Sequence, residues 1–298
     1  MLEHLNEAER PPSRVVVIGA NGFVGRSTSE CLEKDGVKIV KLGRAEVDLL
    51  ADDASERLAD TIKSGDAVVA ISAIAPAKNL DDLMSNMRIV SAIGTAIAAR
   101  SNDISHVVNI SSDAVYADTP TPLNELSPTA PDSYHGTMHL AREVHFKTIG
   151  PQPLAILRPT LIYGASDPHN GYGPNKFRRL AADNQDISLF GEGEELRDHI
   201  LVDDVAELIR LILLNRSHGV LNAVTGHVAS FRDVAEMVVS HFKTPVAIKG
   251  TPRSGPMPHN GYRPFSIAVC NKAFPNFRFT PLADGIGISH QLSMNGEV

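Results

Sequence analysis

The chain has 298 residues, of which 43% are hydrophobic and 21% are charged, and its formal net charge at pH 7 is -7. This length is enough for one large α/β domain, or for a nucleotide-binding domain with a smaller lobe. The acidic balance argues against a nucleic-acid partner and no apolar run is long enough to cross a bilayer, so we expect a cytoplasmic protein with neither kind of partner.

The first predicted strand, residues 15–18, is apolar and runs directly into glycines spaced three residues apart and then into a helical stretch. Gly19 lets the strand turn sharply, Gly22 removes the Cβ that would block a pyrophosphate, and Gly25 lets the helix approach the strand. Backbone N–H groups at the start of such a helix face an anion. The pattern predicts a nucleotide-phosphate site. The polar, acidic residues 1–12 before it predict a flexible arm.

The first half of the chain continues as strands and helices in alternation. Apolar runs predict strands at 37–42, 67–71 and 106–110, and amphipathic stretches predict helices near 53–63 and 81–100. Near-continuous apolar strands that alternate with helices are typical of a parallel sheet covered on both faces. We therefore predict an α/β fold of the Rossmann type, with a doubly wound parallel sheet.

The end of the second predicted strand bears on which dinucleotide binds. In enzymes that prefer NAD, an Asp or Glu at this place accepts a hydrogen bond from the ribose 2′-hydroxyl and would repel a 2′-phosphate. Here Gly43 and Arg44 follow the strand, and an arginine can bind a phosphate as a charge-assisted fork. This favours NADP, with NAD possible. The alternative is that Arg44 is a solvated loop residue.

These motifs together resemble the extended short-chain dehydrogenase/reductases that act on nucleotide sugars, and the resemblance covers nearly the whole chain. Besides the glycines it rests, in the family's order, on residues 48–49, 72–74, 111–116, 134, 158–159, 162–164, 197–204 and 263–264. The resemblance implies cofactor contacts from the glycine turn and from the strand ends: Gly19, Asn21, Gly22, Phe23, Val24, Gly25, Arg44, Asp48, Leu49, Ser72, Ala73, Ile74, Asn86, Ile110, Tyr134 and Pro159.

The resemblance also assigns catalysis to Ser112, which would bind a substrate oxygen, and to Tyr134 as the acid/base residue. A phenol has an ordinary pKa of about 10, so proton transfer at neutral pH needs a nearby cation, which the family supplies as a lysine four residues later. This chain has Met138 there, and a thioether carries no charge. Three hypotheses follow: the positive charge of the oxidised nicotinamide ring, or a nearby group such as His135 or His139, partly substitutes; Tyr134 donates as a neutral phenol in ketone reduction; or the chain is catalytically silent.

The C-terminal half carries the substrate prediction. Residues 189–199 resemble the sugar-nucleotide motif in which a glycine-rich turn presents an arginine to the diphosphate. Arg197 and Arg263 are therefore the predicted diphosphate contacts, since two arginines can bridge its charged oxygens, and surface ion pairs are the alternative. Asp113, beside Ser112, joins them as a substrate contact through the same resemblance.

The predicted organisation is a Rossmann domain of residues 13–168, with about 190–228 returning to it, and a substrate-binding lobe of about 169–189 and 229–298. The expected function is NAD(P)-dependent oxidoreduction of a nucleoside-diphosphate sugar, with reduction of a 4-keto sugar preferred because the chain is short for the family and Arg44 favours NADP. An epimerase and a silent NADP-binding regulatory or partner protein are the alternatives. The resemblance implies a homodimer, and the sequence shows no metal-ligand spacing.

Overall fold

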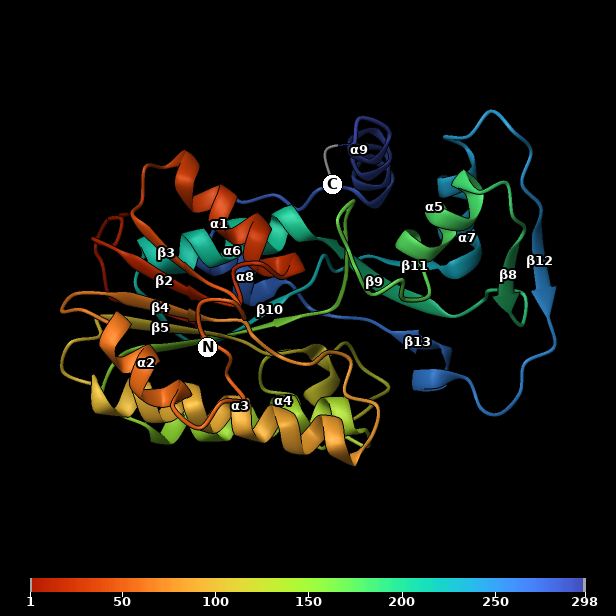
Figure 1. Cartoon of the computed structure of the whole chain (residues 1–298). Helices are drawn as coiled ribbons and strands as arrows, with labels where there is room; N and C mark the ends of the chain where they lie inside the picture. The colour runs from red at the N-terminus through yellow and green to blue at the C-terminus, as the bar shows by residue number, and fades with distance from the viewer. Residues whose placement is uncertain (1, 297–298) are drawn as a thin grey trace.

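The computed structural model describes residues 2–296 and is built on a seven-stranded sheet with helices on both faces (Figure 1). The strand order is β1-β10-β6-β5-β4-β2-β3, and every neighbouring pair is parallel except β1 with β10. The strands of this sheet are β1 (Glu3–His4), β2 (Val15–Ile18), β3 (Ile39–Leu42), β4 (Ala67–Ala70), β5 (His106–Ile110), β6 (Leu154–Pro159) and β10 (Ser217–Ala223). The predicted Rossmann-type α/β fold is confirmed.

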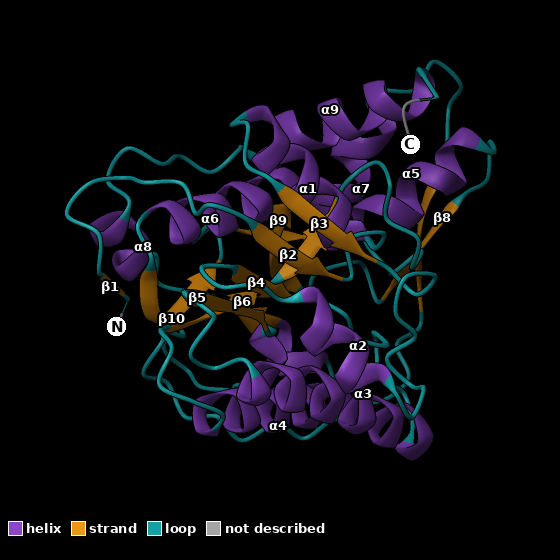
Figure 2. Ribbon diagram, turned by 60° about the vertical axis from the view of Figure 1, so that its left-hand side comes forward, coloured by secondary structure: helices purple, strands orange, loops and turns teal. Residues whose placement is uncertain are grey.

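Two helical layers cover the sheet, and Figures 1 and 2 show them on opposite faces. One layer holds α1 (Phe23–Lys34), α6 (Val202–Leu214) and the short α8 (Ala268–Ala273). The other holds α2 (Ala54–Thr61), α3 (Leu80–Ala99) and α4 (Tyr134–Thr148). A strand between two layers has both of its faces buried, which is why these strands are apolar without a break.

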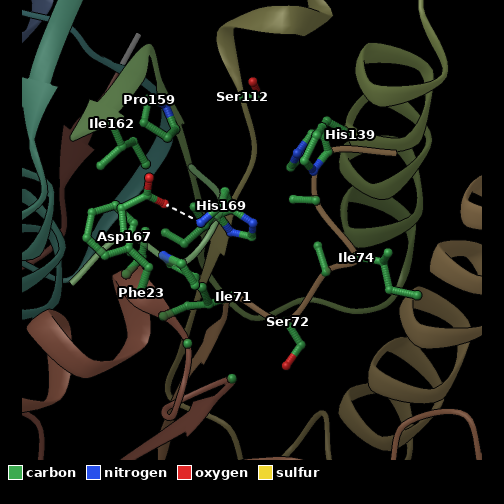
Figure 3. A pocket seen from close by; sticks show the side chains of 18 of the residues that line it. Phe23, Ile71, Ser72, Ile74, Ser112, His139, Pro159, Ile162, Asp167 and His169 are labelled. Atoms are coloured by element: carbon green, nitrogen blue, oxygen red, sulfur yellow. Dashed lines mark hydrogen bonds between the residues drawn. The ribbon is translucent and has the colours of Figure 1, made fainter. Parts of the chain in front are cut away.

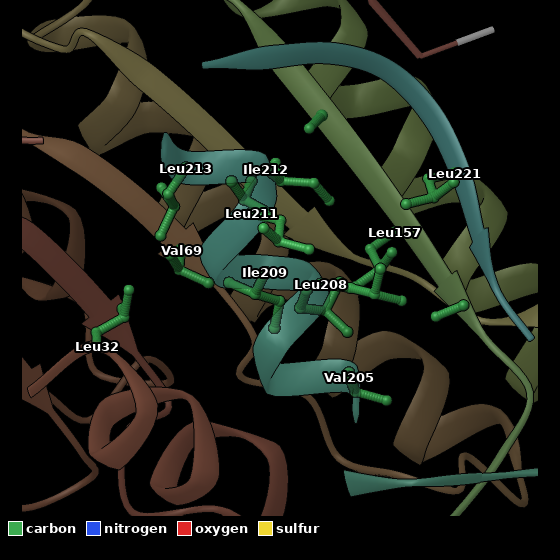
Figure 4. Packing of buried hydrophobic residues seen from close by; sticks show 14 of the residues in the cluster. Leu32, Val69, Leu157, Val205, Leu208, Ile209, Leu211, Ile212, Leu213 and Leu221 are labelled. Carbon is green, nitrogen blue, oxygen red and sulfur yellow. The ribbon is translucent and has the colours of Figure 1, made fainter. Parts of the chain in front are cut away.

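The central strand β2 shows how one sequence serves both layers. Val15 and Val17 belong to the core under α6, whereas Val16 and Ile18 belong to the core under α2 and α3. Successive side chains of a strand point to opposite faces, so all four are buried. Figure 4 shows the first core, where α6 packs its apolar face onto the sheet. Burial of each such aliphatic side chain contributes about 1.5–3 kcal/mol.

A smaller region lies beyond the carboxyl ends of the strands (Figure 1). Its strands are β7 (Leu161–Tyr163), β9 (Leu196–Leu201), β11 (Val228–Ser230) and β13 (Tyr262–Arg263), with β8 (Ile187–Phe190) paired to β12 (Ile248–Thr251). Its helices are α5 (Pro174–Ala182), α7 (Phe231–Val239) and α9 (Leu282–Met294). A separate core that includes Phe177, Phe231 and Val234 holds this region together.

Some elements lie on the other side of the predicted domain boundaries. Strands β7 and β9 were both expected with the Rossmann domain, but they pair with each other, and β9 also pairs with β11 and β13. Helix α8 was expected in the substrate lobe, but Cys270 and Phe274 are buried in the core of the large sheet. Among residues 2–296 we find no helix that combines the length and the apolar character needed to cross a membrane.

The N-terminal arm is held against the large sheet and does not extend as a free segment. Strand β1 pairs antiparallel with β10, and the two ring nitrogens of His4 contact Ser217 Oγ at 2.8 Å and the Ala273 carbonyl at 2.9 Å. The backbone N–H groups of Leu5 and Asn6 both donate to the carbonyl of Asn215. The arm covers what would otherwise be an open edge of the sheet.

Candidate functional site

A cavity of about 770 Å³ lies at the carboxyl ends of the parallel strands. Open α/β sheets bind ligands at this edge, because the loops that leave the strands converge there. Figure 3 shows Ser112 and His139 on one side of the cavity and Pro159, Ile162 and Asp167 on the other. Most of the predicted site residues line it, namely Gly19, Asn21, Gly22, Phe23, Val24, Arg44, Asp48, Leu49, Ser72, Ala73, Ile74, Ile110, Ser112, Asp113, Pro159 and Arg197.

The glycine turn between β2 and α1 forms one end of the cavity. Gly19 has a φ of +97°, which glycine adopts at little cost, and a Cβ there would lie 2.8 Å from the backbone nitrogen of Ser72. Gly25 does not line the cavity; a Cβ on it would lie 2.0 Å from the carbonyl oxygen of Gly19, so it lets α1 approach the turn. Helix α1 starts after Gly22 with no side-chain cap and no acidic residue in its first turn. Its free N–H groups can therefore hold a pyrophosphate.

The adenosine end predicted for the cavity holds Arg44 and Asp48. Their side chains approach to 3.4 Å, and the Arg44 side chain is 81% exposed, so this pair is weak. The Leu50 N–H donates to Asp48, and this bond, with Arg44, holds the pKa of Asp48 below its usual range. The sequence pattern did not identify Glu46, whose carboxylate accepts from the Gly43 N–H at 2.8 Å. That carboxylate is tied to the turn and does not line the cavity.

Asn86 was predicted to contact the cofactor, but the structure places it behind the cavity wall. Its side chain is fully buried and is not among the lining residues. Its Oδ1 accepts from the Ile74 N–H at 2.9 Å and its Nδ2 donates to the Ile74 carbonyl at 3.0 Å. Asn86 therefore fixes the backbone of Ile74, which does line the cavity.

The residues at the family's tyrosine and lysine positions, Tyr134 and Met138, do not line the cavity. Tyr134 is the first residue of α4 and is 46% exposed, and Met138 is fully buried. His135 directly follows Tyr134, and His139 directly follows Met138. These two histidines line the cavity instead. Residues four apart share a helix face, and a step of one residue turns that face by about 100°.

Gly136 explains this rotation of α4. A Cβ on Gly136 would lie 2.2 Å from the carbonyl oxygen of Ala114, so the helix packs directly on the loop after β5 at this point. Ser112 begins that loop, and its Oγ accepts from the Ala114 N–H at 3.2 Å. The close approach sets Ser112 and the two histidines around the same cavity.

The two histidine rings contact each other at the cavity wall. Their ring centroids lie 4.7 Å apart with the planes at 89°. The Nδ1 atoms of both are buried without a hydrogen bond within the described part of the chain. Burial lowers the pKa of His135, which Asp113 partly offsets, and burial with the neighbouring His135 and Arg142 lowers the pKa of His139 well below its usual value. Burial therefore favours the neutral form of both rings.

Arg142 lies behind His139 on the same helix and is fully buried. Its guanidinium donates to Asn109 Oδ1, to the Ser72 carbonyl at 2.6 Å and to the Ala70 carbonyl at 2.7 Å. None of the ion pairs found in residues 2–296 involves it. Burial lowers its pKa to about 10, so it remains a cation at neutral pH.

Only one of the two predicted arginines lines the cavity. Arg197 does so from β9, and its Nη1 lies 3.2 Å from Glu195 while its buried Nε has no partner among the described residues. Arg263 is buried away from the cavity, with its guanidinium bonded to Asp113 and Asp118. A diphosphate contact is therefore not supported for Arg263, because both carboxylates already occupy its donors.

The sequence reasoning did not identify His199, a further cavity residue on β9. It is 3% exposed, its Nε2 has no partner within residues 2–296, and burial lowers its pKa to about 3. His199 lies two residues after Arg197 on the same strand, and residues two apart on a strand face the same side. That spacing could have indicated His199 from the sequence. The loop before α5 closes the cavity through Asp167, His169 and Tyr172.

Comparisons with known proteins agree with this geometry. The family model described as the NAD dependent epimerase/dehydratase family matches residues 15–224. A UDP-glucose 4-epimerase from Mycolicibacterium smegmatis is 27% identical over 65% of this chain and 71% of its own length. A dTDP-4-dehydrorhamnose reductase from the same organism is 25% identical over 74% of this chain and 67% of its own length.

Solved structures share the fold over nearly the whole chain. A GDP-L-fucose synthetase from Naegleria fowleri bound to NADP has a TM-score of 0.80 at 16% identity and covers 98% of both chains. The protein MoeE5 in complex with UDP-glucose and NAD has a TM-score of 0.81 at 20% identity and covers 96% of this chain and 100% of its own. At these identities the likeness concerns the fold.

Proposed function

This chain belongs to the NAD dependent epimerase/dehydratase family, and from that premise we propose that it is an NADP-dependent reductase of a 4-keto nucleoside-diphosphate sugar. One observation carries the proposal: a single cavity joins an anion cradle at the glycine turn to Ser112 and to Arg197. The names of two relatives support a reaction at carbon 4 of the sugar, since one is a UDP-glucose 4-epimerase and the other is a dTDP-4-dehydrorhamnose reductase.

The residues at the glycine turn fit a nicotinamide dinucleotide. The first turn of α1 offers N–H groups without a side-chain acceptor, and Gly19 and Gly22 add no side-chain atoms to the turn. Arg44 at the far end can bind a 2′-phosphate, which favours NADP over NAD. When bound, the cofactor supplies the hydride for reduction of the keto carbon.

The remaining cavity residues act on the sugar nucleotide. The Ser112 hydroxyl can donate to the keto oxygen and so stabilise the negative charge that develops on it. Arg197 can bind the diphosphate through donors that include the unpartnered Nε. The loop with Asp167 and His169 lines the same cavity and can cover the sugar.

The test is oxidation of NADPH, followed by its fluorescence, against a panel of 4-keto sugars linked to UDP, dTDP and GDP. We expect consumption of NADPH with at least one member and competition by the matching nucleoside diphosphate. A protein that neither consumes NADPH nor binds any of the three diphosphates at millimolar concentration would contradict the proposal. A silent nucleotide-binding protein would bind NADPH without consuming it.

A 4-epimerase is the second candidate, supported by the identity to the UDP-glucose 4-epimerase. An epimerase returns its cofactor to the starting form in each turnover, so it changes the configuration of UDP-glucose without net consumption of NADPH. Chromatography of the sugar product separates the two reactions. The resemblance also implies a homodimer through α3 and α4, where Met84 and Val144 are exposed, and sedimentation measures that state.

A further inference from the structure

Helix α4 presents a row of nitrogen-bearing side chains toward the cavity and the sheet. His135 and His139 line the cavity, and Arg142 follows one turn later with its guanidinium bonded to the Ser72 carbonyl. Tyr134 and Met138 are also four residues apart and share a neighbouring face, and neither is among the residues that line the cavity. The face that meets the cavity thus carries imidazoles where a phenol was expected.

We propose that His135, and not Tyr134, exchanges the proton with the substrate oxygen. The inference rests on the proposed function and names the acid/base residue of that reaction. His135 lines the same cavity as Ser112, which would bind the same oxygen. Its ring is held by the perpendicular ring of His139, with 4.7 Å between the centroids. His139 is thereby a positioning residue.

Reduction transfers one hydride and one proton to the keto group. The keto carbon gains a hydride, the π pair of the C=O bond moves to the oxygen, and that oxygen takes a proton from the imidazolium of His135. His135 becomes neutral and regains a proton from solvent. One ketone, one NADPH and one proton are consumed, and one alcohol and one NADP⁺ are formed. In the reverse direction neutral His135 accepts the hydroxyl proton as the hydride leaves.

The charged groups around the pair assign the proton to His135. Asp113, from the loop packed on α4, favours protonation of His135, and its carboxylate is itself bonded to Arg263. Arg142 and His135 both disfavour protonation of His139, which is 6% exposed. A proton on this pair therefore resides on His135, because a carboxylate faces that ring and a guanidinium lies behind the other.

This arrangement predicts a pH dependence that a tyrosine would not give. Reduction needs the imidazolium, so its rate falls as pH rises through the pKa of His135, and alcohol oxidation rises over the same range. Burial lowers that pKa from the ordinary histidine value, so the transition lies below about pH 6.5. A tyrosine donor would place the transition on the alkaline side of neutrality.

The experiment compares the whole protein with Tyr134→Phe, His135→Gln and His145→Gln, the last a control histidine on α4 outside the cavity. We expect His135→Gln to lose about 100-fold or more in keto-sugar reduction, with the other two variants unchanged. The transition below pH 6.5 should be present in the parent and in Tyr134→Phe. Loss of activity in Tyr134→Phe with activity retained in His135→Gln would overturn the proposal.

A second measurement needs neither turnover nor a folded variant. Imidazole proton NMR of the parent, with and without NADP⁺, should show movement of the His135 and His139 resonances and none for His145. An unmoved His135 resonance in the presence of bound NADP⁺ would overturn the proposal. If the parent reduces no member of the panel, the proposed function fails, and the NMR result alone decides whether His135 lies beside the nicotinamide site.

Discussion

The two ends of the cavity are built by different means. At the glycine turn the ligand-binding groups are backbone N–H groups of α1, and their position follows from Gly19 and Gly25. At the α4 end the acting groups are side chains, and a helix rotates by about 100° per residue. Sequence spacing alone therefore locates a backbone site, whereas a side-chain site also depends on how the helix is rotated.

The largest expected effect comes from Met138→Lys. The residue is fully buried, so a lysine there places an ammonium away from water and should lower the free energy of unfolding by several kcal/mol. His139→Lys is the matched variant. Its ammonium can reach the cavity, so its free energy of unfolding should fall by less than that of Met138→Lys. Urea unfolding measures the free energy of unfolding of both variants. A Met138→Lys protein of parental stability that gains activity would show that the α4 face is assigned wrongly.

At the other end, Gly25→Ala tests the backbone site. The added Cβ would lie 2.0 Å from the Gly19 carbonyl oxygen, so the turn must shift, and we expect a loss of about 1–3 kcal/mol in stability and weaker NADPH binding. Gly171→Ala is the stability control, because a Cβ there meets nothing within 4 Å. Equal stability of the two variants would argue against a tight turn.

Arg197→Lys tests the diphosphate contact with a smaller change. Lysine keeps the charge but loses the fork, so KM for the sugar nucleotide should rise about tenfold, or about 1.4 kcal/mol. Arg232→Lys serves as control, since Arg232 pairs with Glu192 outside the cavity. An unchanged KM in Arg197→Lys would place the diphosphate elsewhere.

Arg44→Ala should have the smallest effect. We expect NADPH binding to weaken by about 1 kcal/mol, because the exposed guanidinium acts through solvent and is already near Asp48. NADH provides the internal control, since it lacks the 2′-phosphate. Fluorescence titration of both nucleotides measures the difference, and equal weakening would remove the basis for preferring NADP.

The sequence predicted the sheet and its helices because buried parallel strands leave continuous apolar runs such as 15–18 and 67–70. It also located the strand ends around the cavity, since loops after parallel strands meet at one edge. The rotation of α4 was not predictable from spacing, because it depends on contact between Gly136 and the Ala114 carbonyl across the loop.

Long-range partners account for the other differences. The sequence near Arg263 offers its guanidinium no carboxylate, but the fold brings Asp113 and Asp118 to it from a distant part of the chain. The polar sequence of the N-terminal arm predicts flexibility, but the His4 ring forms hydrogen bonds with Ser217 and with the Ala273 carbonyl. In both cases the deciding contact joins residues that no local pattern connects.

Arg142 has a mechanical consequence. It joins α4 to the carboxyl end of β4 through the carbonyls of Ala70 and Ser72, and to β5 through Asn109. Two walls of the cavity therefore move as one body, because separating them would leave a buried cation and three oxygens without partners. Opening or closing of the cavity is then expected on the facing side, which the loop with His169 and strand β9 line.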